Sequence, residues 1–206
     1  MAFPASKLRG LHEDALREVA NIGTGHAVTS LGMLTGENFV MSVPAVGVVA
    51  MEAFESVVGD PEALAAAVYM PVGGDAPGHV AFLFPYVCAC NLADMLLGQE
   101  PGSTVELGEM ECSALMEVGN ILVSSFLNAI ADMTGLNLPA SPPGIAVDMT
   151  GAILESIAAV SVDLGDHALT IMTRLIDCEH PIEGVFVFIP EPRALPTLFS
   201  ALGLDA

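Results

Sequence analysis

Residues 14–23 read Asp-Ala-Leu-Arg-Glu-Val-Ala-Asn-Ile-Gly, and residues 113–122 read Ser-Ala-Leu-Met-Glu-Val-Gly-Asn-Ile-Leu. The second stretch repeats the first at an offset of 99 residues, from position 14 to position 113. The same offset aligns Thr35-Gly36 with Thr134-Gly135, and Pro44 with Pro143. Two copies at constant internal spacing indicate a duplicated unit that carries two equivalent sites.

Both copies lie within stretches of helical periodicity, the first running from about Gly10 to Leu34. The predicted buried stripes are Leu16, Val19, Ala20, Gly23, Ala27 and Leu31 in the first helix and Leu115, Val118, Leu122, Phe126, Ala129 and Ile130 in the second. The predicted outer faces carry Asp14, Glu18, Asn21 and Gly25 in the first helix and Ser113, Glu117, Asn120 and Ser124 in the second. Gly36 and Gly135 then follow as predicted C-terminal caps.

Strand-like segments follow each helix. The predicted strands are residues 38–43, 46–51, 65–72 and 79–84 in the first half and 144–149, 157–163, 168–176 and 184–189 in the second. Each half then has a short helix that ends in Leu-Gly, at Leu97-Gly98 and at Leu202-Gly203. Neither half can bury its sheet alone. We therefore predict an α+β fold with a mainly antiparallel sheet and two long site-bearing helices. The expected organisation is a single pseudo-two-fold domain over residues 1–206, built from repeats at about 8–98 and 107–203.

The charge balance excludes one class of partner. The chain of 206 residues has 25 acidic residues against five lysines and arginines, which gives a formal net charge of −20. Nucleic acid is excluded as a partner because phosphate binding requires a basic surface, whereas partners with basic faces are favoured. The acidity fits either a cytoplasm of high salt or an ordinary bacterial protein.

The sequence also predicts a soluble, cytoplasmic protein without membrane insertion. Gly, Pro, Asp or Glu interrupts every long apolar run. The N-terminus, Met-Ala-Phe-Pro-Ala-Ser-Lys, has no basic stretch followed by an apolar core, as a secretory signal requires.

The metal-binding residue types show no ligand pattern. Cys88 and Cys90 form one close pair without a second, and Cys112 and Cys178 stand alone. Zinc sites generally use two such pairs, so we predict reduced cysteines packed as small apolar residues. The five histidines are scattered. We therefore expect no metal and no cofactor held by this chain.

The repeated Glu-x-x-Asn pair carries the functional information. Residues three apart on a helix project into one surface patch, so Glu18 lies beside Asn21 and Glu117 beside Asn120. An amide is neither a base nor a nucleophile at neutral pH, but it can orient a water molecule by a hydrogen bond. A carboxylate can accept a proton or bind a basic group of a partner. The face has no catalytic triad or phosphate-binding loop, so most of the chemical machinery must arrive with the substrate.

These residues resemble the signature of the CheC family of chemotaxis phosphatases, whose relatives include CheX and FliY. That signature is Asp or Ser, three residues, Glu, two residues, Asn, twenty-two residues and Pro. It matches Asp14-Glu18-Asn21-Pro44 and Ser113-Glu117-Asn120-Pro143. Residues 141–149, Ser-Pro-Pro-Gly-Ile-Ala-Val-Asp-Met, also resemble the family segment after the second helix.

The resemblance implies a phosphatase that hydrolyses the aspartyl phosphate of the response regulator CheY. By that analogy Asn21 and Asn120 orient the attacking water, while Glu18 and Glu117 bind a lysine of the regulator. Asp14 and Ser113 support the site, and Pro44 and Pro143 fix the chain between helix and sheet. The resemblance also implies Mg²⁺ held by the regulator and CheD as a regulating partner.

The first copy departs from the family pattern at Ala20, Thr24 and His26, where the family has Gly, Ala and Asn. We expect His26 to be a surface or packing residue rather than a catalytic one. The second copy follows the pattern more closely, which makes it the better-supported site.

Two other functions are compatible with the pattern. A non-catalytic adaptor would bind CheD or phosphorylated CheY without efficient turnover. A structural component of the flagellar switch, as FliY is, is expected to carry a further motor-docking domain, for which the chain leaves no room after the second repeat.

Overall fold

The computed structural model describes residues 10–36, 40–50, 60–160, 167–176 and 181–204. Its centre is one six-stranded sheet in the order β1-β5-β6-β3-β2-β4, in which every neighbouring pair is antiparallel. The strands are β1 (Val40–Ala50), β2 (Leu64–Val72), β3 (Gly78–Pro85), β4 (Gly144–Met149), β5 (His167–Ile176) and β6 (Pro181–Pro190). The predicted α+β class with an antiparallel sheet is confirmed.

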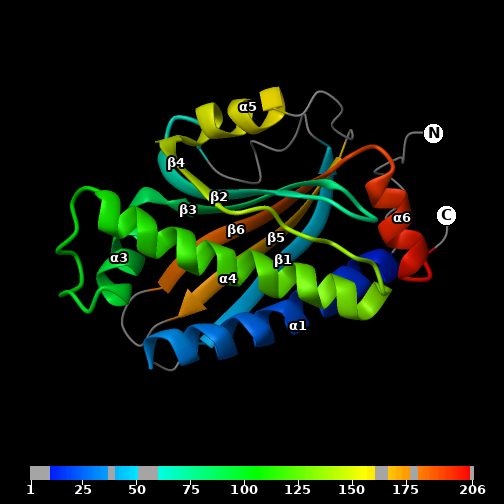
Figure 1. Ribbon diagram of the computed structural model, residues 1–206, viewed down its shortest axis with the longest axis horizontal. Helices are drawn as coiled ribbons and strands as arrows, with labels where there is room; N and C mark the ends of the chain where they lie inside the picture. The colour runs from blue at the N-terminus through cyan, green and yellow to red at the C-terminus, as the bar shows by residue number, and fades with distance from the viewer. Residues whose placement is uncertain (1–9, 37–39, 51–59, 161–166, 177–180, 205–206) are drawn as a thin grey trace.

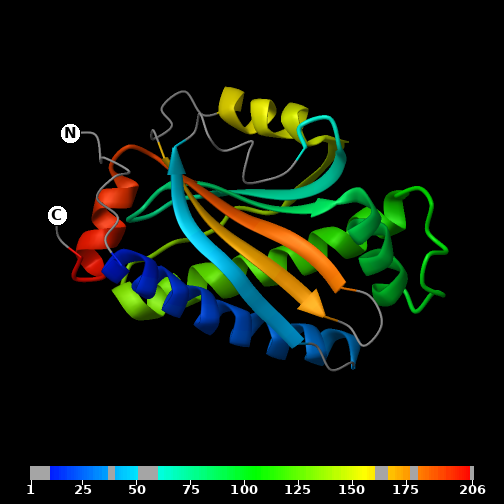
Figure 2. The ribbon, with the colours of Figure 1, turned by 180° about the vertical axis from the view of Figure 1, so that it is seen from behind.

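Helices cover both faces and both ends of this sheet. They are α1 (Gly10–Thr35), α3 (Tyr86–Leu96), α4 (Glu109–Thr134), α5 (Thr150–Val160) and α6 (Ala194–Ala201). The two long helices α1 and α4 lie side by side and antiparallel on one face, and α5 lies on the other (Figure 1). Seen from behind, α3 and α6 stand at opposite ends of the molecule (Figure 2). The long helices are therefore presented together as one layer.

The strand order interleaves the two halves of the chain. β1 pairs with β5 and β4 pairs with β2, so each edge strand has its partner in the other half. If β1, β2 and β3 are exchanged with β4, β5 and β6, respectively, the sheet has the same strand order, read from its opposite edge. This symmetry of connection agrees with the expected pseudo-two-fold arrangement.

The core lies between the sheet and the α1–α4 layer, and its aromatic residues define its centre. The rings of Phe126 on α4 and Phe186 on β6 have centroids 4.9 Å apart. Every residue of the two predicted apolar stripes is buried. Gly23 is one of these buried residues. A Cβ at this position would lie 2.5 Å from the Phe126 ring, so the close packing here requires glycine. The helical periodicity therefore identified the buried face of both long helices correctly.

Both predicted glycine caps are confirmed. Gly36 and Gly135 have φ angles of 77° and 72°, a conformation that glycine adopts without a steric penalty. Their amides donate to the carbonyl oxygens of Gly32 and Ala131 at 2.9 and 2.8 Å. At the start of α4, the Gly108 amide donates to the Glu111 carboxylate at 3.0 Å. These contacts set the ends of the helices that carry the polar pairs.

The segment between the halves is held by a buried carboxylate. Asp94 on α3 has no exposed surface. It accepts hydrogen bonds from the amides of Gly102, Ser103 and Thr104 at 2.7, 3.0 and 2.9 Å, and from the Ser103 hydroxyl at 2.9 Å. Burial by itself raises the pKa of Asp94, but the hydrogen bonds from Thr104, Ser103 and Gly102 outweigh it and hold that pKa below its usual value. The linker is thus fixed onto α3.

Two predictions about strands were wrong. Residues 157–160 belong to α5 rather than to a strand, and residues 161–163 lie outside the described residues. The β-branched residues suggested a strand, but Ile153, Leu154 and Ile157 recur at helical spacing and are buried against the sheet. In the first half, the two segments predicted on either side of Pro44 form one strand, β1, with a register shift between Ser42 and Ala45. Residues 38, 39 and 51 of those segments lie outside the described residues.

One helix in the described part of the chain, α4, is long and apolar enough to cross a membrane. More than half of its most apolar stretch is buried inside the protein. Leu122, Phe126 and Ile130 supply that apolar character and face the sheet. The extent of burial of α4 is therefore that of a helix packed in the core of a globular protein.

Candidate functional site

The first polar pair lies on the outer face of α1. Asp14, Glu18 and Asn21 are all exposed, as the periodicity predicts, and the buried Leu16 and Val19 anchor the opposite face. Asn21 borders a shallow hollow of about 380 Å³ between α1 and the first residues of β1. The other residues lining it are Thr24, Gly25, Val28, Val40, Met41, Ser42 and Val43. The hollow thus combines one amide with apolar and small polar groups of an edge strand.

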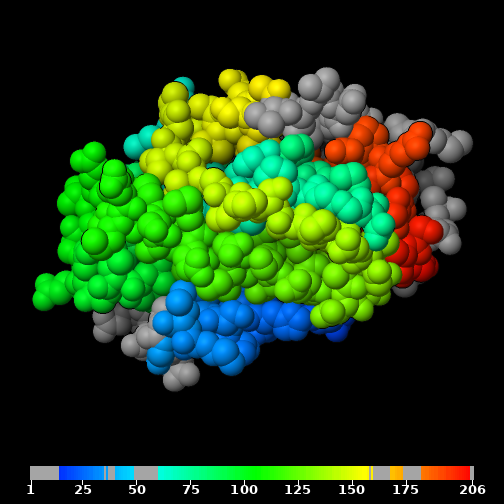
Figure 3. All heavy atoms as spheres, in the orientation of Figure 1, coloured from blue at the N-terminus to red at the C-terminus, as the bar shows by residue number. Residues whose placement is uncertain are grey.

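The second polar pair lies on the outer face of α4. Ser113 and Glu117 are exposed, and Asn120 is half-buried. Asn120 borders a groove of about 410 Å³ whose second wall is α1. The α1 wall consists of His26, Thr29 and Ser30, and the α4 wall also contains Ile121, Ser124, Ser125 and Asn128. In Figure 3, α1 and α4 are in contact along the lower part of the surface. The second site is therefore completed by the first repeat.

The four side chains that define the pairs are available to a partner. Among the described residues, no hydrogen bond or ion pair engages the side chains of Glu18, Asn21, Glu117 or Asn120. Each carboxylate lies one helical turn from its amide, so one bound molecule can contact both. The arrangement can bind a basic group and orient a water molecule beside it.

The two prolines occupy different positions. Pro143 is half-buried and directly precedes β4, in the connection from α4 to the sheet. Pro44 is exposed and lies inside β1, where the strand changes register. An edge strand with a bulge tolerates proline because no ladder hydrogen bond is lost there. Pro143 therefore lies at the expected position between helix and sheet, whereas Pro44 does not, because it lies inside the strand β1.

Sequence reasoning missed the contribution of α1 to the second site. His26, Thr29 and Ser30 recur at i, i+3 and i+4, which is the spacing of one helix face. That signal was present in the sequence, but nothing in it showed which element this face would meet. His26 is exposed, as predicted, and lies in the same groove as Asn120. The two asparagines line separate hollows.

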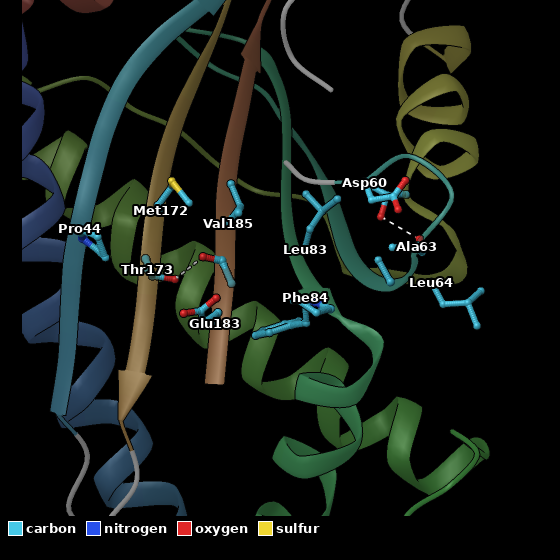
Figure 4. A pocket seen from close by; sticks show the side chains of 14 residues that line it. Pro44, Asp60, Ala63, Leu64, Leu83, Phe84, Met172, Thr173, Glu183 and Val185 are labelled. Atoms are coloured by element: carbon cyan, nitrogen blue, oxygen red, sulfur yellow. Dashed lines mark hydrogen bonds between the residues drawn. The ribbon is translucent and has the colours of Figure 1, made fainter. Parts of the chain in front are cut away.

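A further cavity, of about 320 Å³, lies on the opposite face of the sheet (Figure 4). Pro44, Glu183 and Val185 line it, together with Asp60 and Thr173. The Thr173 hydroxyl donates to the carbonyl oxygen of Gly184 at 3.0 Å, so that polar group is already satisfied. Val185 belongs to the apolar cluster under α5, whereas α1 and α4 cover the other face. This cavity is separate from both polar pairs.

The described residues contain no cluster of three or more His, Cys, Asp and Glu side chains that could hold a metal ion. Cys88, Cys90 and Cys112 are free thiols, and Cys178 lies outside the described residues. Burial raises the pKa of the Cys90 and Cys112 thiols, which keeps them protonated and unreactive near neutral pH.

Comparison with known proteins places this fold and these residues in a family. The fold is similar to that of FliY from Thermotoga maritima, with a TM-score of 0.78 and 18% identity, covering 97% of this chain and 100% of the other. A model of the CheC-like family matches residues 11–48 and again residues 110–147. The second match begins and ends 99 residues after the first, at the offset of the repeat.

Full-length relatives agree with this assignment. The CheY-P phosphatase CheC of Bacillus subtilis is 32% identical over 194 residues, which cover 92% of this chain and 93% of that protein. A putative CheY-P phosphatase, CheC1 of Halobacterium salinarum, is 27% identical over 189 residues, covering 91% and 94%. The chain belongs to the CheC family.

Proposed function

We propose that this chain is a chemotaxis phosphatase that hydrolyses the aspartyl phosphate of phosphorylated CheY. The observation that carries the proposal is a Glu and Asn pair on each long helix, solvent-accessible and without a hydrogen bond or ion pair among the described residues, in a chain 32% identical to a CheY-P phosphatase. Packing does not account for these residues, because they lie on the faces directed away from the core.

The proposed reaction is an in-line displacement at phosphorus. The oxygen of a water molecule bonds to phosphorus while the bond to the aspartyl oxygen breaks, so the regulator regains its carboxylate and inorganic phosphate leaves. Asn21 or Asn120 accepts a hydrogen bond from that water and fixes its direction of attack. Glu18 or Glu117 binds a lysine ammonium of the regulator next to the phosphate. In this proposal the regulator, and not this chain, holds the Mg²⁺ ion that takes part in the reaction.

The proposal extends to location and regulation. A phosphatase for a cytoplasmic response regulator works in the cytoplasm, and we propose CheD as a second partner that alters its activity. The net charge of −20 supports binding to partners with basic surfaces.

The decisive experiment measures phosphate release from phosphorylated CheY of the same organism. The variants are Asn21→Ala, Asn120→Ala and the double variant, with Asn137→Ala as the matched control because it removes an exposed amide outside both hollows. We expect the wild type and the control to accelerate release and the double variant to lose about a hundredfold in turnover. Circular dichroism at low and at molar salt shows whether every variant is folded.

The adaptor function remains the second candidate because the same exposed faces can bind a partner without turnover. Undiminished phosphate release by the double variant rules out water positioning by these amides. No acceleration by the folded wild type at any salt, together with measurable binding of phosphorylated CheY, identifies the adaptor. The likeness to FliY concerns the fold and does not assign a motor role.

A further inference from the structure

The cavity of about 320 Å³ on the face of the sheet opposite α1 and α4 has no part in the proposed reaction. Its floor is a row of apolar residues that crosses three neighbouring strands (Figure 4). Leu83 on β3 pairs with Val185 on β6, and Val185 pairs in turn with Met172 on β5. Leu83 and Val185 are buried, whereas Met172 is 37% exposed. A volume of this size is at the lower end of the range for small-molecule sites, about 300–1,000 Å³.

Hydrogen bonds at the start of α5 hold one wall of this cavity in place. The amide and the hydroxyl of Thr150 both donate to the carbonyl oxygen of Ala63, at 2.8 and 3.0 Å. The Gly151 amide donates to the carbonyl oxygen of Pro61 at 2.9 Å. The Ala63 amide donates to the carbonyl oxygen of Asp60 at 3.1 Å, which closes a turn. The wall is therefore fixed before a ligand binds, and a fixed wall reduces the cost of ordering the site.

The side chains that line the cavity can accept hydrogen bonds but have none left to donate. Asp60 and Glu183 are exposed carboxylates. The hydroxyls of Thr150 and Thr173 already donate to backbone carbonyl oxygens. No lysine, arginine or histidine is among the described residues that line the cavity. An anionic ligand would meet like charge here, whereas a ligand with N–H donors and a positive charge is complementary.

Asp60 is the carboxylate that can select such a ligand. Its Oδ1 atom accepts a hydrogen bond from the Glu62 amide at 3.0 Å, and no other hydrogen bond or ion pair engages its side chain among the described residues. A carboxylate can accept about four hydrogen bonds, so acceptor capacity remains. Glu183 differs, because Arg174 is its register partner on β5. We therefore assign the selectivity to Asp60.

We propose that this cavity binds a small organic ammonium ion, with its apolar tail over Leu83 and Val185 and its ammonium group at Asp60. In Figure 4, Leu83 and Val185 lie between Asp60 and the exposed Met172, so a tail that covers them also reaches that methionine. The net charge of −20 raises the local concentration of cations. The inference is independent of the proposed function, since neither Glu-Asn pair lines the cavity.

Three probes with the same six-carbon tail test the chemistry of the site. They are hexylammonium, hexanol and hexanoate, each titrated into the full chain with isotope-labelled methionine methyl groups. About 0.5 M salt screens the net charge. We expect hexylammonium to shift the Met172 methyl resonance with a Kd on the order of millimolar, and hexanol and hexanoate to bind at least about fivefold and tenfold more weakly. The methyl group of Met149, which is exposed on β4 outside the cavity, should not shift.

Two pairs of variants locate the ammonium group and the tail. Asp60→Asn removes the charge at nearly constant shape, and its control, Glu62→Gln, removes an exposed carboxylate that does not line the cavity. We expect Kd for hexylammonium, measured from the line width of its own signals, to rise about fivefold in Asp60→Asn and to stay constant in Glu62→Gln. Met172→Lys places a like charge beside the tail and should weaken binding about tenfold, whereas Met149→Lys should not.

Three outcomes overturn the inference. Hexylammonium that leaves the Met172 methyl resonance unchanged up to about 50 mM shows that the cavity does not bind it. Equal Kd values for the three probes show that the cavity does not select a cation. Equal weakening by Asp60→Asn and Glu62→Gln shows that the overall acidity of the chain, and not this site, attracts the probe. Circular dichroism of each variant separates a loss of binding from a loss of folding.

Discussion

The two long helices carry the same polar pair in different surroundings. Asn21 on α1 is exposed and borders a hollow whose other wall is the edge strand β1. Asn120 on α4 is half-buried in a groove whose other wall is α1. The repeat therefore copied residues, while the position of each helix over the sheet decides what those residues meet. Equal motifs do not make equal sites.

Separate removal of the two amides tests this inequality most strongly. We expect Asn120→Ala to lower kcat about tenfold and Asn21→Ala to lower it less than twofold, with a combined loss of about a hundredfold. The reason is that the half-buried Asn120 loses less side-chain freedom when it orients water. Steady-state phosphate release from phosphorylated CheY gives both numbers. Equal losses in the two single variants would show that the surroundings do not matter.

A buried position with different residues in the two helices provides a test of stability. Gly119 on α4 corresponds to Ala20 on α1, and a Cβ at Gly119 would lie 2.5 Å from the Cβ of Val68. We expect Gly119→Ala to lower the free energy of unfolding by about 1–3 kcal/mol through overpacking. Ala20→Gly should cost about 1–2 kcal/mol, because it lowers helix propensity and removes a buried methyl group.

Urea denaturation at fixed salt measures both changes. Equal stability of Gly119→Ala and wild type would mean that β2 moves away from α4 at little cost. Circular dichroism in the absence of urea shows whether each variant retains the helices.

The fold was predictable where local patterns decide it. The buried stripe from Leu115 to Ile130 and the cap at Gly135 follow from residue spacing and from glycine's freedom at positive φ. The helix α5 was missed because Ile157 and its β-branched neighbours also suit a strand, and burial against the sheet decided between them. The bulge at Pro44 depends on pairing with β5, which is far away in the sequence.

The short helices that close the two halves also differ at one buried position. The amides of residues 97, 98 and 99 bond to the carbonyls of Ala93, Met95 and Asp94, and those of residues 202, 203 and 204 bond in the same pattern to Leu198, Ser200 and Phe199. When the two helices are aligned by these bonds, Asp94 corresponds to Phe199, and both side chains are buried. The carboxylate binds the linker, so we expect Asp94→Asn to lower the free energy of unfolding by about 2 kcal/mol at pH 7.

The pH dependence of that effect follows from the lowered pKa of Asp94. A carboxylate with a lower pKa in the folded state contributes stability above its unfolded pKa of about 3.9 and loses it as pH falls through the folded pKa. The difference in stability between wild type and Asp94→Asn should therefore shrink below about pH 4. Urea titrations at pH 7 and pH 3 measure it, and a difference that is constant with pH contradicts the charge-based explanation.

The smallest expected effect concerns His26, the α1 residue beside Asn120. In the Asn21→Ala background, His26→Ala should raise KM for phosphorylated CheY about threefold, since an exposed hydrogen-bonding group contributes little. His26→Asn should restore most of the loss because its amide can reach the same groove. A fall in kcat without a change in KM would instead place His26 next to the reacting atoms.

The candidate site was predictable only in part. The pairs Glu18–Asn21 and Glu117–Asn120 on the outer helix faces follow from helical spacing, and their roles stay predictions until phosphate release is measured. The α1 wall of the second groove could not be predicted, because it depends on how two helices 99 residues apart cross. Residue type and spacing do not encode that crossing.

The interleaved sheet has a consequence for the order in which the protein is made. Val40 pairs with Ile176 and Ala50 with His167, so β1 finds its partner only after most of the chain has left the ribosome. At about 5–20 residues per second the wait is on the order of ten seconds. A nascent chain that stalls before β5 leaves an eleven-residue strand without its neighbour, open to pairing with other chains. The strand synthesised first is thus among the last to be protected, and chaperone dependence should be greatest during that interval.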